Sequence, residues 1–283
     1  MKETKLTASP PRKAQASGPR RIWTEVTFVR HLIAVNLASA MEYRVSFITQ
    51  ILGMFLNNGI YFIFWLLFFD KFGTVRGYNI REIYLLFGMV ALGHGLGAMF
   101  AGNIGSALAQ TIAQGRLDYY LPLPRSLLTH VIFSRMTISA IGDVTFGLFA
   151  YLFTGRFHPV EMVLFLVSAV LAAGIFVSYG ILAGSLAFFM GNAQQISMQA
   201  TNAIITFALY PNTLFSGATR LLLYTLIPAA FVGAVPVTIV TERNGLLLLG
   251  LAAGVVFFGA LATGVFYLGL RRYESGSAIN VNL

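Results

Sequence analysis

Six long apolar stretches, separated by short polar segments, dominate the chain. They cover about residues 46–69, 83–104, 127–153, 160–190, 197–215 and 245–270. A helix needs roughly 20 apolar residues to cross the hydrocarbon core of a bilayer, and each stretch approaches or exceeds that length. The pattern therefore predicts an all-α integral membrane protein, with six transmembrane helices in a domain over 45–271.

One further apolar segment, 219–240, breaks the pattern. It contains Pro228 and Pro236, and proline removes a backbone donor and kinks or ends a helix. We expect a re-entrant helical hairpin on the extracellular side, between spans five and six. A seventh span over about 221–239 is the alternative, and the loop charges do not choose between the two.

The ends of the chain lie outside the spans. Residues 1–21 are basic and rich in Pro, Ser and Ala, without the apolar core of a signal peptide, and predict a disordered tail. In 22–44, apolar residues recur every three or four positions, as at Val26, Val29, Ile33 and Leu37. This spacing predicts an amphipathic helix in the cytoplasmic membrane interface. Residues 272–283 form a C-terminal tail.

Loop charges indicate on which side of the membrane the termini lie, and capping residues indicate where two of the helices begin. Lys and Arg concentrate in the N-terminal tail, around residues 116–135 and at the end of the last span, which predicts that both termini are cytoplasmic. Asn79 followed by Glu82 predicts a capping box at the start of span two. Pro159 suits the first turn of span four.

Composition supports a membrane location. The chain is 57% hydrophobic and 10% charged, with a mean hydropathy of +0.75, whereas soluble domains carry about 25% charged residues. The net charge of +9 does not predict nucleic-acid binding, because the basic residues lie in the tail and loops. There they fit membrane topology and contact with lipid headgroups.

No sequence signal for catalysis is present. The chain has no Gly-Lys dipeptide and no lysine after Lys71, so it lacks a P-loop and has no ATPase site of that kind. The stretch 93–98 fits the letters G-x-G-x-x-A but lies within an apolar span, where small residues favour helix packing. The four histidines are scattered and there are no cysteines. We therefore predict no metal site and no catalytic site.

A polar segment over 112–125 separates spans two and three. It resembles the cytoplasmic coupling element of ABC-2 class exporter permeases, multidrug types among them, which follows the pattern I-x-x-G-x-L-D-x-x-L-x-x-P. The matching residues are Ile112, Gly115, Leu117, Asp118, Leu121 and Pro124. The sequence departs from the pattern at Leu123, where an arginine is expected. The helix over 22–44 and the run 42–44 before span one resemble the same family.

The resemblance implies a function and partners. The chain would be the permease subunit of an ATP-driven exporter in the cell (plasma or inner) membrane, moving a small amphipathic substrate by alternating access. It would pair with a second permease, identical or related, and with separate ATPase subunits that bind ATP and Mg. Within the coupling segment, 108–126, the residues expected to contact the ATPase are Gly115, Leu117, Asp118, Tyr119, Tyr120, Pro124 and Arg125.

The resemblance also implies a substrate path along spans two and five, which would face the second permease. The candidate residues are His94, Met99, Phe100, Asn103, Met198, Asn202, Phe207 and Tyr210.

Polar groups within the spans can instead stabilise the fold. We expect Asn57, Asn58 and Asn103 to form interhelical hydrogen bonds, and Asp143 to pair with Arg135.

Two other functions are compatible with a membrane protein of this kind. An ion-coupled secondary carrier would need ionisable residues within the spans of two related halves, and the sequence shows one acid and no internal repeat. A non-transporting membrane scaffold would not bind an ATPase.

Overall fold

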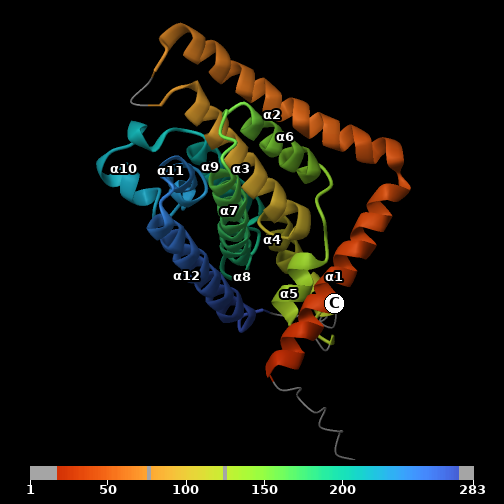
Figure 1. Cartoon of the computed structure of the whole chain (residues 1–283). Coiled ribbons are helices and arrows are strands. Elements are labelled where there is room, and N and C mark those ends of the chain that lie inside the picture. Colours follow the sequence, from red (N-terminus) through yellow and green to blue (C-terminus); the bar gives the residue numbers. More distant parts are fainter. Residues whose placement is uncertain (1–17, 75–77, 124–125, 274–283) are drawn as a thin grey trace, which may run out of the picture.

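The computed structural model describes residues 18–74, 78–123 and 126–273, and side chains from residue 24 onward. The predicted N-terminal tail falls outside these residues except for its last few positions, as do Pro124, Arg125 and most of the C-terminal tail. Every regular element in the described part is a helix (Figure 1). The all-α prediction is therefore confirmed for that part of the chain.

The helices follow one another in the order shown in Figure 1. They are α1 Gly18–Glu42, α2 Arg44–Phe72, α3 Ile80–Phe100, α4 Ser106–Ala113, η1 Arg116–Tyr119, α5 Leu127–Phe133, α6 Ala140–Leu152, α7 Pro159–Ser185, α8 Ala187–Met190, α9 Gln194–Ala208, η2 Asn212–Leu214, α10 Gly217–Leu222, η3 Ala229–Phe231, α11 Ala234–Glu242 and α12 Gly245–Leu270.

Four helices among the described residues are long and apolar enough to cross a membrane. They are Arg44–Phe72, Ile80–Phe100, Pro159–Met190 and Gly245–Leu270, and they coincide with predicted spans one, two, four and six. Both predicted start signals are confirmed. The Asn79 side chain and Glu82 form a complete capping box at the start of α3, and Pro159 lies in the first turn of α7.

The predicted third span is not one continuous helix. It is divided into α5 and α6, and residues 134–139 between them lack regular α-helix. The backbone N–H of Gly102 donates to the carbonyl of Arg135, and the N–H of Thr137 donates to the carbonyl of Ala98. The end of α3 thus supplies hydrogen-bond partners for the break, which is why non-helical backbone is tolerated here. A Cβ on Gly102 would lie 2.8 Å from the Arg135 carbonyl oxygen.

The region of predicted span five is also interrupted. Helix α9 has 15 residues, shorter than the roughly 20 of a usual crossing, and the chain after it passes through Pro211 into η2. Residues 219–240 contain part of α10, then η3, then most of α11. No continuous helix covers 221–239 in the described structure, which argues against a seventh span. A re-entrant hairpin there stays a prediction.

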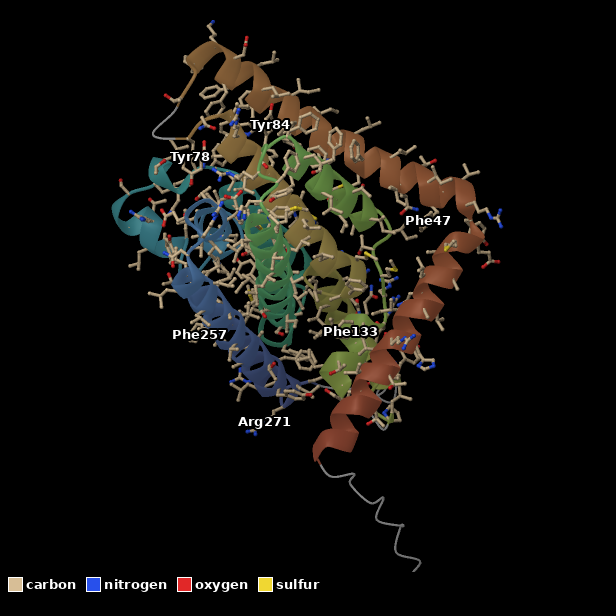
Figure 2. The ribbon with its side chains drawn as sticks, in the orientation of Figure 1. Phe47, Tyr78, Tyr84, Phe133, Phe257 and Arg271 are labelled. Atoms are coloured by element: carbon tan, nitrogen blue, oxygen red, sulfur yellow. The ribbon has the colours of Figure 1, made fainter. Side chains whose placement is uncertain are left out.

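Helix α1 packs against the short helix α5. The Asn36 side-chain amide donates to the carbonyl of Phe133 at 3.3 Å, and the ring of Phe28 meets His130 edge-on, 4.8 Å between centroids. Phe133 lies beside α1 in Figure 2. A helix therefore exists where the amphipathic connecting helix was expected. Its position in a membrane interface stays a prediction.

Helix α3 occupies the centre of the bundle, between α6 on one side and α7 on the other. Glycines allow this close approach. A Cβ on Gly95 would lie 2.8 Å from the backbone nitrogen of Val144, and one on Gly93 would lie 3.0 Å from the Cβ of Ala172. The 93–98 stretch therefore serves helix packing, as its position within an apolar span predicted.

Replacing Gly95 by alanine should destabilise the bundle. The added methyl would meet the backbone of α6, which cannot move away as a flexible side chain could, and such overpacking costs about 1–3 kcal/mol. Gly264→Ala is the matched control, because Gly264 lies in α12, where an added Cβ would meet nothing within 4 Å. Thermal unfolding in detergent should show a lower Tm for G95A only. Equal Tm values would contradict the packing argument.

Candidate functional site

A cavity of about 660 Å³ lies between α2, α3, α6 and the α9 region. Its volume falls in the range of roughly 300–1,000 Å³ that is usual for small-molecule sites. One wall is aromatic and includes Tyr61, Phe64, Trp65, Phe87 and Tyr210. The rings contact one another, with Trp65 edge-on to Tyr210 at 5.7 Å between centroids.

The opposite part of the cavity carries a cluster of polar side chains. The Asp143 carboxylate accepts a hydrogen bond of 2.6 Å from the Asn58 amide and lies 3.2 Å from Nδ1 of His94. Asp143 is only 3% exposed. Its position in the first turn of α6 is favourable for a negative charge, because the positive end of the helix dipole lies there.

This arrangement corrects the expected pairing of Asp143 with Arg135. The expectation assumed one helix through both residues, which would place them two turns apart on one face. The break at 134–139 separates them, and the partners of Asp143 come from α2 and α3 instead. The interhelical hydrogen bonds predicted for Asn58 and Asn103 are confirmed, since Asn103 donates to the carbonyl of Val131.

Glycines, which have no side chain, allow the three helices of the cluster to come close together. A Cβ on Gly95, the residue after His94, would lie 2.9 Å from the Cβ of Asp143. Gly142, the residue before Asp143, similarly faces the Ile51 carbonyl, and its Cβ would lie 2.8 Å from the Cβ of Met54. The glycines therefore set the short distances among Asn58, His94 and Asp143.

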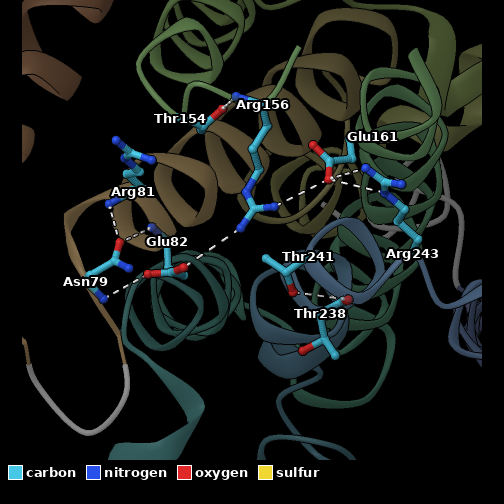
Figure 3. Close-up of polar contacts among 9 residues, drawn as sticks. All are labelled: Asn79, Arg81, Glu82, Thr154, Arg156, Glu161, Thr238, Thr241 and Arg243. Atoms are coloured by element: carbon cyan, nitrogen blue, oxygen red, sulfur yellow. Dashed lines mark hydrogen bonds and ion pairs between the residues drawn. The ribbon is translucent and has the colours of Figure 1, made fainter. Parts of the chain in front are cut away.

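A second polar cluster lies at the end of the bundle where α3 and α7 begin (Figure 3). Both Arg156 and Arg243 contact Oε1 of the buried Glu161, at 3.5 and 3.3 Å, and Arg156 also lies 3.9 Å from Glu82. Each carboxylate faces an arginine, and Glu82 also caps α3. This network joins α3, α7 and the end of α11.

The described part of the predicted coupling segment, residues 112–123, lies at the opposite end of the bundle from that network. Gly115 adopts a left-handed conformation, φ 67°, which turns the chain from α4 into η1. Leu117 is fully buried in a hydrophobic cluster with residues of α5 and α12. Tyr120 points inward as well: its hydroxyl donates to Ser134 Oγ at 3.3 Å. Tyr119, by contrast, is 77% exposed.

Asp118 is half-buried and lies beside the phenol of Tyr273, just after α12. Burial and the neighbouring Asp118 carboxylate raise the pKa of Tyr273 to about 12. The phenol therefore keeps its proton throughout the neutral range. The side chain that the sequence pattern singled out is directed toward the protein's own C-terminal region.

A comparison with protein-family models matches residues 55–277 to the ABC-2 family transporter protein model. The chain belongs to this family. The match covers most of the chain, including all of the residues that line the cavity except Met54, the Glu161 network and the 112–125 segment. A search of curated proteins finds no match. The ABC-2 family protein is thus a multi-pass membrane protein of an ABC transporter, and membership implies association with ABC ATPase subunits.

In this ABC-2 family protein, three of the eight residues predicted for the substrate path line the cavity: His94, Asn202 and Tyr210. Asn103 is buried against α5, and Phe207 packs against Phe215. Met99, Phe100 and Met198 are not among the cavity residues either. Their role in a path stays a prediction.

Apart from Tyr210, sequence reasoning missed the aromatic wall of the cavity. Asn58, Tyr61 and Trp65 are spaced three and four residues apart, so they share one face of α2. That spacing of a polar residue with aromatic residues was the available signal. It was hidden because nearly every residue of the span is apolar.

Replacing Glu161 by glutamine should lower the stability of the ABC-2 family protein. The carboxylate is buried and contacts two arginines, and loss of hydrogen bonds to a charged group costs about 1.5–3 kcal/mol. Glu242→Gln makes the same chemical change at an exposed position nearby and is the control. Thermal unfolding should separate the two variants. An unchanged Tm for E161Q would show that the network does not stabilise the fold.

Proposed function

We propose that the protein is the permease subunit of an ATP-driven ABC exporter. It pairs with a second permease copy and with separate ATPase subunits, and moves a small amphipathic substrate through the membrane by alternating access. Family membership supports the transporter class. The observation that carries the coupling role comes from residues 112–123. The base of this segment, around Leu117, is fixed in the core, while its tip, Tyr119 with Leu121 and Leu123, is exposed.

The course of the chain between the two ends of the bundle supports a topology with six crossings. The Glu161 network marks one end, where α3 and α7 begin. The 112–125 segment marks the other, together with α5 and the end of α12. Helices α2, α3, α5 with α6, α7 with α8, α9 and α12 provide the six passes. In this topology the coupling end is cytoplasmic, both termini are cytoplasmic, and the protein resides in the cell (plasma or inner) membrane.

The exposed tip of the coupling segment supplies the surface for the ATPase. Tyr119, Leu121 and Leu123 are exposed, and exposed aromatic and apolar side chains on a fixed element suit protein contact. Leu117, Tyr120 and Asp118 hold the base. Movement of the tip therefore reaches α5 through Tyr120 and α12 through Asp118 and Tyr273. Asp118 acts in coupling by holding the segment in place.

A row of exposed polar side chains on α9 is the observation that favours pairing with a second permease. Gln195, Gln199, Asn202 and Thr206 are all exposed, and their spacing of three or four residues puts them on one face. Uncovered polar side chains are unfavourable against lipid. A second permease copy would cover this face and close the cavity. Helix α3 is central in the bundle, so α9 and the largely exposed α2 would make this contact, and the pathway would include the cavity.

Accessibility of engineered cysteines tests the topology, because the chain has no natural cysteine. Arg116 and Phe157 are exposed at opposite ends of the bundle. In intact cells, a membrane-impermeant maleimide should label F157C, and it should label R116C only after the membrane is permeabilised. Labelling of both from outside, or the reverse pattern, would refute the proposed orientation.

ATPase recruitment tests the coupling role. Tyr119→Asp should weaken copurification of the ATPase by about 10-fold or more, since interface aromatic residues often contribute over 1.4 kcal/mol. Membrane insertion should not change, because Tyr119 is exposed. Phe157→Asp, which alters an exposed aromatic residue at the other end, is the matched control. Recovery of wild-type amounts of ATPase with Y119D would contradict docking through this tip.

A further inference from the structure

The cavity combines one buried carboxylate with an aromatic wall. Among its lining residues, Asp143 is the only acid and His94 the only basic side chain. The other titratable groups there are the phenols of Tyr61 and Tyr210. On the α7 side, the rings of His94 and Phe176 meet edge-on, 5.4 Å between centroids. Asp143 is therefore the one carboxylate that a ligand in the cavity can meet.

We infer that the cavity binds a small organic cation with an aromatic or apolar body, and that this cation pairs with the Asp143 carboxylate. The identification of the cation as cargo rests on the proposed function. The binding site itself depends only on the residues that line the cavity.

Asp143 supplies the carboxylate of the site. It accepts a hydrogen bond from Asn58, lies beside His94 and occupies the first turn of α6. A buried carboxylate without a positive partner is unfavourable. Because no lysine or arginine lines the cavity, a cationic ligand would supply that partner.

The aromatic wall fits the same type of ligand. The faces of Trp and Tyr attract cations, and their area packs against an apolar body. Trp65 lies between Phe64, at 5.8 Å, and Tyr210, at 5.7 Å, so α2 and the segment after α9 each contribute rings. An anionic ligand would face Asp143 without any lysine or arginine among the lining residues to offset the repulsion.

The test is calorimetric titration of the purified full-length permease, without ATPase, in a nonionic detergent. Tetraphenylphosphonium is the cationic probe, and tetraphenylborate is an anion of nearly the same size and shape. We expect binding of the cation and much weaker binding of the anion. Equal affinity for the two ions would overturn the inference without any variant being needed.

A variant then tests the role of Asp143. Asp143→Asn should weaken tetraphenylphosphonium binding by roughly 10- to 100-fold, as loss of a charge-assisted contact does. Asp70→Asn, the same change at an exposed position outside the cavity, should leave binding unchanged. Thermal unfolding checks that D143N remains folded. Wild-type affinity in folded D143N would overturn the inference.

Failure of ATPase copurification would refute the exporter function but leave these binding results intact, so the two proposals fail separately.

Discussion

Close packing of α3 against α6 and α7 is the contact on which the rest of the structure depends. Apolar helices gain little from burying apolar surface when lipid surrounds them, so association relies on close fit between surfaces. Gly88 and Gly95 face α6, and Gly93 faces α7; a Cβ at each would lie 3.0 Å or less from the neighbouring helix. His94 lies between two of these glycines, so the packing that holds the bundle also sets its distance to Asp143.

The two charge clusters of the bundle differ in their partners. At the Glu161 network each acid faces an arginine, and the groups join three parts of the bundle (Figure 3). Asp143 instead has a histidine and an amide as partners, beside a cavity. The charge of Glu161 is thus offset within the protein, whereas no lysine or arginine lines the cavity beside Asp143.

The predicted coupling segment contains both buried and exposed residues. Leu117 and Tyr120 fix the segment to α5, and Asp118 places it against the end of α12. Tyr119 extends outward. At the same end, Arg271 follows α12 (Figure 2), and α1 packs on α5. A force applied to Tyr119 would therefore reach α5 and α12 through side-chain contacts, and α1 through its packing on α5.

The sequence by itself determined the membrane class, the family, and the spans that became α2, α3, α7 and α12. It also determined the starts of α3 and α7, because capping depends on residues within a few positions of each other. Only the tertiary structure decided the break before α6, the pairing of Asp143 with His94 and Asn58, and the aromatic wall around Trp65. Hydropathy reports local composition, whereas these features depend on neighbours brought together from distant segments. The Arg135 expectation was wrong for that reason: the backbone partners that stabilise the break at 134–139 come from the end of α3.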